Sequence, residues 1–67
     1  MNTDRLGILI REKIGSIKTF SERTGITTRS IRHYRNGIVP RDLRRIETMA
    51  VVLGVSKAEI QELFKIN

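Results

Sequence analysis

One stretch decides the fold of this 67-residue chain: Phe20-Ser-Glu-Arg-Thr-Gly25-Ile-Thr-Thr-Arg-Ser-Ile31-Arg-His-Tyr34. It predicts two short helices joined by a tight turn. Gly25 stands where the first helix must end in a left-handed residue, a conformation that glycine adopts without a Cβ penalty. Ile26 is the apolar residue of the turn, and the hydroxyl of Thr27 or Thr28 is placed to cap the second helix.

The two helices share an inward face and leave a polar outward face. The residues predicted to face inward recur at three- and four-residue spacing: Phe20, Thr24, Ile31 and Tyr34. The opposite face of the second helix carries long or polar side chains: Thr28, Arg29, Arg32 and His33. A short helix that presents hydrogen-bond donors outward suits the major groove of DNA. The stretch therefore predicts a helix-turn-helix.

The segment before the motif predicts one further helix, over residues 4–14. Thr3 or Asp4 is its N-terminal cap, and Gly15 closes it. Gly7 inside this helix costs about 1 kcal/mol relative to alanine, so we expect the helix to depend on tertiary packing. Ser16 then caps the first helix of the motif, which covers residues 17–24.

Two more helices follow the motif. The motif's second helix covers residues 28–35 and stops at Asn36-Gly37, which tolerate the left-handed conformation. After a connector over residues 38–41, a fourth helix has apolar residues at helical spacing and ends at Gly54. The fifth helix begins with a capping box formed by Ser56 and Glu59. The sequence thus predicts an all-α fold, a single domain of five helices over residues 1–67 with a central helix-turn-helix.

Composition excludes several classes of protein. The chain has no cysteine, so disulfides and zinc ribbons are impossible, and one histidine without clustered carboxylates argues against a metal site. No apolar run approaches the ~20 residues of a membrane span, and the N-terminus lacks the pattern of a signal peptide. No nucleophile–base pair is visible. We therefore expect a cytoplasmic protein that is not an enzyme, with no cofactor and no evident small-molecule ligand.

Positive charge is concentrated in one window. The net charge of +6 lies wholly between Arg23 and Arg45, where seven arginines accompany a single acid, Asp42. A solvated basic surface is the plain alternative. However, all seven cations are arginine, whose planar fork binds a phosphate or a guanine edge with two hydrogen bonds. The window therefore favours a nucleic-acid partner.

Together these features resemble the lambda-repressor/Cro-like (Xre-type) family of helix-turn-helix regulators. The resemblance runs from about Leu6 to Leu63 and rests on the spacing of Phe20, Gly25, Ile26, Ile31 and Tyr34, on Asn36-Gly37 and Pro40, and on Met49-Ala-Val-Val-Leu-Gly-Val-Ser56. It implies a phage or prokaryotic transcriptional regulator that binds the major groove of an inverted-repeat operator in double-stranded DNA as a homodimer. Because no residues follow Asn67 for an effector domain, we expect a Cro-like repressor.

The resemblance also implies residue roles. By position the base-reading residues are Thr27, Thr28, Arg29 and His33, and the exposed face adds Arg32. The family positions for backbone contacts fall on Ser16, Asn36, Gly37, Ile38 and Arg41. Where the family often has glutamine this chain has Ile17, so Lys18 or Thr19 would take over its phosphate.

Three further arginines are predicted to contact the DNA backbone. Many family members carry an acid at position 35, paired to a basic residue of the first helix. Ile10 and Arg35 make such a pair implausible here, so we expect Arg35 to be free for phosphate. Arg44 and Arg45, like Arg41, stand where a helix begins and its dipole disfavours cations. Phosphate binding would explain that placement.

Alternative interpretations come from two classes. Residues 24–34 also resemble the recognition segment of MerR-type regulators, and an excisionase-like protein is a related possibility. The MerR family needs a wing, for which the segment between Gly37 and Asp42 leaves no room. A protein-interaction or antitoxin module on the same fold would instead expose an apolar groove, for which the sequence offers Val52 and Ile66. For a homodimer we predict contacts by these two residues and by Phe64.

Overall fold

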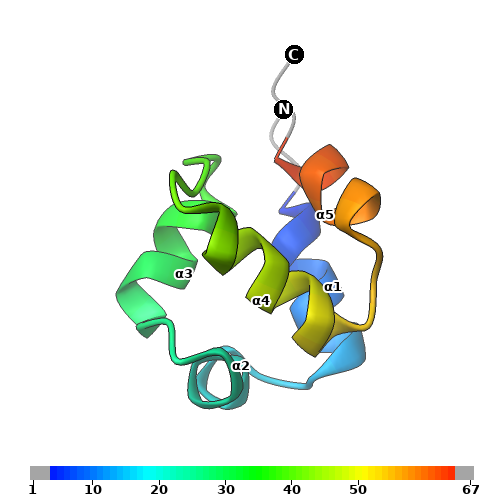
Figure 1. Cartoon of the computed structure of the whole chain (residues 1–67). Helices are drawn as coiled ribbons and strands as arrows, with labels where there is room; N and C mark the ends of the chain where they lie inside the picture. The colour runs from blue at the N-terminus through cyan, green and yellow to red at the C-terminus, as the bar shows by residue number, and fades with distance from the viewer. Residues whose placement is uncertain (1–3, 65–67) are drawn as a thin grey trace.

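The computed structural model describes residues 4–64, which form five α-helices and contain no strand. The helices are α1 (Arg5–Lys13), α2 (Ile17–Thr24), α3 (Thr28–Arg35), α4 (Leu43–Leu53) and α5 (Lys57–Leu63) (Figure 1). The helices of the motif, α2 and α3, have the predicted bounds, and α1 is one residue shorter than predicted at each end. The predicted all-α, five-helix fold is confirmed.

Local signals set the ends of the helices. Five side chains accept a hydrogen bond from a backbone N–H in the first turn of their helix: Asp4, Ser16, Thr27, Asp42 and Ser56. The cap of α1 is therefore Asp4, and that of α3 is Thr27. Ser56 also forms the predicted capping box with Glu59. Gly25 and Gly54 end α2 and α4 with φ of 74° and 72°, a region in which other residues would be strained.

Two hydroxyls fix the turn between α2 and α3. Thr24 Oγ1 donates to the carbonyl of Phe20 at 2.8 Å and accepts from the N–H of Ile26 at 3.2 Å. The hydroxyl of Ser21 donates to the carbonyl of Ile26, whose side chain is buried. Because the bonds to Ile26 satisfy an N–H and a carbonyl of the turn, they hold α3 in a defined orientation on α2.

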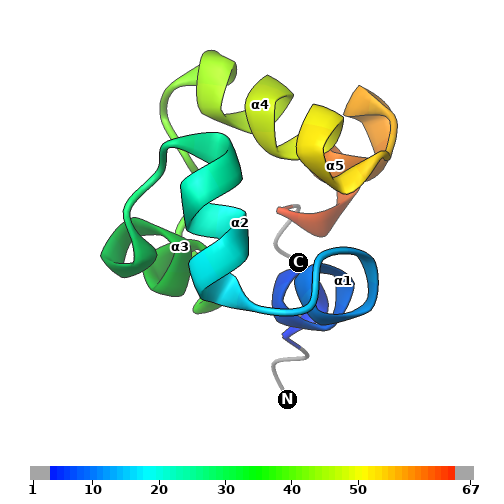
Figure 2. The same cartoon turned by 90° about the horizontal axis from the view of Figure 1, so that it is seen from below.

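Every helix contributes to the core. The largest fully buried side chains come one from each helix: Ile10, Phe20, Ile31, Met49 and Ile60. α4 packs against α1, α2 and α5, while α1 also packs against α2 and α3. Figure 2 shows α1 and α4 on opposite sides of the domain. α3 lies at the flank, so one of its faces is buried and the other is turned outward (Figure 1).

Candidate nucleic-acid interface

The outward face of α3 carries four of the predicted base-reading residues. Thr28, Arg29, Arg32 and His33 are all exposed. On the opposite face, Ile31 and Tyr34 are buried in the core. The predicted separation of a polar outer face from an apolar inner face is therefore confirmed.

Thr27, the fifth predicted base reader, is also the cap of α3. Its Oγ1 accepts from the N–H of Ser30 at 3.2 Å and donates to the hydroxyl oxygen of Ser30 at 3.1 Å. A hydroxyl has a single proton to donate. The cap uses one lone pair of Thr27, so Thr27 can donate to a base only by giving up its hydrogen bond to the hydroxyl of Ser30.

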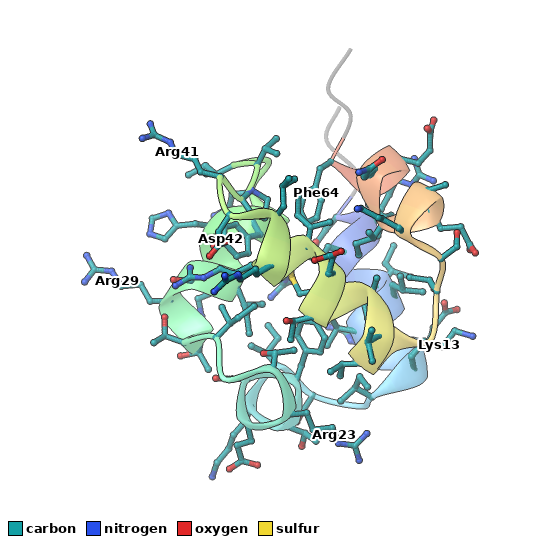
Figure 3. The ribbon with its side chains drawn as sticks, viewed as in Figure 1. Lys13, Arg23, Arg29, Arg41, Asp42 and Phe64 are labelled. Carbon is teal, nitrogen blue, oxygen red and sulfur yellow. The ribbon has the colours of Figure 1, made fainter. Side chains whose placement is uncertain are left out.

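Three arginines of the basic window, Arg29, Arg41 and Arg44, have no acidic partner within residues 4–64. Figure 3 shows Arg29 and Arg41 extending from the same side of the molecule, whereas Arg23 and Lys13 extend from other sides. Arg41 and Arg44 are exposed, and among residues 4–64 neither these two nor Arg29 forms an ion pair. The three guanidinium groups can therefore take an anionic partner without first losing a contact.

Tyr34 holds Arg45 in place. Arg45 Nη1 donates to Tyr34 Oη at 2.7 Å, and this hydrogen bond raises the pKa of Arg45. The ring of Tyr34 is buried, as predicted, and meets the ring of Phe64 edge-on with 6.3 Å between the centroids. Because the core fixes the ring, the hydroxyl restrains a guanidinium group beside the end of α3.

The prediction that Arg35 is free for phosphate is wrong. Its guanidinium forms an ion pair with Asp4, in which Nε donates to Oδ2 at 2.7 Å. The second carboxylate oxygen of Asp4 accepts from the N–H of Gly7 at 2.8 Å. Burial alone would raise the pKa of Asp4, but the hydrogen bonds from Arg35 and Gly7, with the charges of Arg35 and Arg11, lower it overall. The end of α3 is thereby tied to the start of α1.

Gly7 makes room for this ion pair. A Cβ at position 7 would lie 2.6 Å from Arg35 Nε and would also overlap the carboxylate of Asp4. Real Cβ atoms do not approach other atoms this closely, so a side chain at position 7 would displace Arg35 or Asp4 from the ion pair. Sequence reasoning recorded the helix-propensity cost of Gly7 but missed this role, because the contact comes from the far end of α3.

The remaining predicted backbone contacts lie at the start of α2 and just after α3. Ser16 and Lys18 are exposed, and Ser16 Oγ is used as the cap of α2, accepting from the N–H of Thr19 at 3.2 Å. Three further residues are exposed in the turn that follows α3: Asn36, Gly37 and Ile38. The N–H of Ile38 donates to the carbonyl of His33 at 3.1 Å, which holds this turn against α3.

The predicted dimer contacts need correction. The prediction of Phe64 as a dimer contact is wrong, because this residue is 8% exposed and belongs to the core. Val52 is half-buried and packs against the core, whereas its neighbour Val51 is 80% exposed. Ile66 lies outside the described residues. α4 therefore presents two large apolar side chains to solvent, Leu43 at its start and Val51 near its end, and the more exposed valine of the Val51–Val52 pair is not the predicted one.

Other kinds of site have little support in the described chain. Across residues 4–64, no three side chains of the metal-binding types are grouped so as to hold an ion, and none of the helices has the length and apolarity to span a membrane. No family model matches this chain, and neither a curated protein nor a solved structure matches it significantly. Function is therefore inferred from the chain's own side chains.

Proposed function

We propose that this protein is a sequence-specific DNA-binding regulator that places α3 in the major groove. The observation that carries the proposal is the outward face of α3, where Arg29, Arg32 and His33 are exposed while the opposite face is anchored in the core. An α-helix with its side chains is about 10–12 Å across, and the major groove is about 12 Å wide. A helix of this size can insert without distorting the domain or the duplex.

The side chains of α3 would divide the work of base recognition. Arg29, in the first turn, has the planar fork that matches O6 and N7 of guanine, and such a bidentate contact discriminates by about 1–3 kcal/mol. Arg32 and His33 stand one turn further along the helix and would reach the next base pairs or the flanking phosphates. Thr28 would add a hydroxyl and a methyl group at the tip of the helix.

The phosphate contacts would come from the chain that follows α3. Arg41, Arg44 and Arg45 are exposed, and Arg45 is held against Tyr34. Contacts of this kind supply affinity that is independent of sequence and that falls as salt rises. Asp42 is the one acid between Arg23 and Arg45. Its carboxylate accepts from the N–H of Arg44 and so caps α4.

The helix order supports a lambda-repressor/Cro-like regulator within this class. α2 and α3 form the central motif, and a loop without strands, residues 36–42, leads from α3 to α4. A MerR-like reading needs a wing in that loop and is disfavoured. The protein would act in the cytoplasm of a phage host or other prokaryote, occupying an inverted-repeat operator as a homodimer and excluding the transcription machinery.

Selection from random duplex DNA tests this proposal. The purified protein should enrich a defined sequence, and Arg29→Ala combined with Arg32→Ala should abolish its preference for that sequence. Lys13→Ala combined with Arg23→Ala is the matched control, because it removes the same charge from other sides of the molecule (Figure 3). A protein that is folded by circular dichroism but enriches no sequence would refute the proposal. If the two double variants lose affinity for DNA equally, the binding is non-specific attraction between charges.

A further inference from the structure

α4 carries an apolar surface that the core leaves uncovered. Val51 is the most exposed of the large apolar side chains in residues 4–64, at 80%. Beside it lies a hollow of about 420 Å³, and the residues that line it are Arg44, Glu47, Thr48, Val51 and Val52. We propose that these five residues, here named the α4 surface, bind the same surface of a second copy of this chain around a two-fold axis.

The distribution of charge favours a second copy as the occupant. The arginines of residues 23–45 carry the whole net charge, so two copies repel each other over most approaches. Residues 46–56, by contrast, contain no lysine or arginine and one acid, Glu47. The same lack of cations makes this part of α4 unsuitable for a phosphate backbone. Arg44 is the one cation among the five residues of the α4 surface, so two basic domains can meet there with little repulsion between like charges.

The α4 surface is also self-complementary. Its centre is apolar, and its two charged residues, Arg44 and Glu47, have opposite signs. A two-fold axis brings both signs from each copy to one contact, where Arg44 of one copy can pair with Glu47 of the other. An Arg44 paired in this way is withdrawn from the phosphate contacts, which are then left to Arg41 and Arg45. Glu47 has an ion pair with Lys57 at 3.5 Å, but both side chains are 55% exposed, so this weak pair leaves Glu47 accessible. Val51, as the outermost apolar side chain, would lie closest to the axis and meet its own counterpart.

The direction of the axis rests on the proposed DNA-binding function. α4 and α3 lie on different sides of the domain, and the N-terminal end of α4 is joined to the end of α3 by residues 36–42 (Figure 1). If the two α4 helices cross with their N-terminal ends on the same side, both α3 helices face the same side of the dimer. Half-sites one helical turn apart require about 34 Å between them. Two domains measuring 30 × 22 × 20 Å can meet that requirement when they stand side by side.

Cross-linking tests the contact directly, because the chain contains no cysteine. Val51→Cys introduces one thiol at the proposed axis, and Ile8→Cys is its matched control. Ile8 is 51% exposed, lies on α1 and is not part of the α4 surface. With a short bismaleimide, free or on selected DNA, Val51→Cys should form covalent dimers at protein concentrations at which Ile8→Cys does not. Equal yields from the two variants, or no dimer from Val51→Cys in either condition, would overturn the inference.

A charge substitution separates this inference from the proposed function. Val51→Glu should raise the dissociation constant of the dimer in sedimentation at least tenfold, about 1.4 kcal/mol, while Ile8→Glu leaves it unchanged. On DNA, Val51→Glu should keep its affinity for a single half-site and lose its preference for the full site. If the wild type dimerises through Val51 but enriches no DNA sequence, the function fails and the α4 contact stands. If Val51→Glu binds the full site with wild-type affinity, the α4 contact fails and the function stands.

Discussion

Arg35, the last residue of α3, donates from Nε to Oδ2 of Asp4, the cap of α1, although 31 positions separate the two residues. The same carboxylate therefore begins one helix and anchors the end of another. Because α3 carries the candidate base-reading residues, this ion pair is one of the contacts that fix how the helix is presented. It also withdraws Arg35 from the arginines available to DNA.

The Asp4–Arg35 pair should make stability depend on acidity. Asp4 has a lowered pKa in the folded protein, so its stabilising contribution is present above its unfolded-state pKa and is lost as the pH falls through the folded-state pKa. Asp4→Asn keeps a cap but removes the charge, and should lower the free energy of unfolding at neutral pH by about 1 kcal/mol or less, because the pair is partly exposed. Urea unfolding across the acid range should show the two proteins converging at low pH. A difference that stays constant with pH would contradict this assignment.

Gly7→Ala should destabilise the protein, although alanine is the better helix former by about 1 kcal/mol. The added Cβ would meet Arg35 Nε and the Asp4 carboxylate, and one of them must move. The free energy of unfolding from urea denaturation measures the effect. In an Asp4→Ala background the carboxylate is gone, and the same change at Gly7 should become neutral or stabilising. Additive effects in this double-mutant cycle would mean that Gly7 does not serve the ion pair.

Arg29→Ala should relax specificity at one position of each half-site and weaken binding to the best site by about 1–3 kcal/mol. Competition binding with single-base variants of the selected site measures both effects. Arg23→Ala is the control, since it removes an exposed arginine of α2 that points to another side of the molecule (Figure 3). If Arg29→Ala keeps the wild-type preference at every position, Arg29 contacts phosphate or solvent and reads no base.

Arg45→Ala should reduce the slope of log affinity against log salt by about 1, as expected for the loss of one phosphate contact. Tyr34→Phe removes the hydroxyl that restrains Arg45 but keeps the charge. It should therefore leave the slope unchanged and weaken binding by at most about 1 kcal/mol. The ring keeps its contact with Phe64, so thermal unfolding should change little. A salt slope that Arg45→Ala does not alter would place this guanidinium outside the DNA contact.

Local chemistry was enough to predict the helices and the outer face of α3. Ser16 and Thr27 cap α2 and α3 through hydrogen bonds to residues three positions away, and Gly25 ends α2 by its own backbone conformation. Such signals act within one turn of helix, so they can be read from neighbouring residues. The exposure of Arg29 followed in the same way from its spacing to Ile31 and Tyr34.

The partners of individual side chains depended on how the helices pack. Arg35 meets Asp4, Arg45 meets Tyr34, and a Cβ on Gly7 would meet both members of an ion pair, only because α1, α3 and α4 lie at particular distances and angles. Helical spacing assigns each residue to a face but does not fix the edge of a face to within one residue. For this reason the exposed valine of α4 was predicted to be Val52, whereas it is Val51. The sequence by itself therefore determined where helices begin and end and which side of α3 is polar. Tertiary packing decided which arginines remain unpaired and which apolar side chains of α4 stay exposed, because those outcomes depend on atoms brought together from distant parts of the chain.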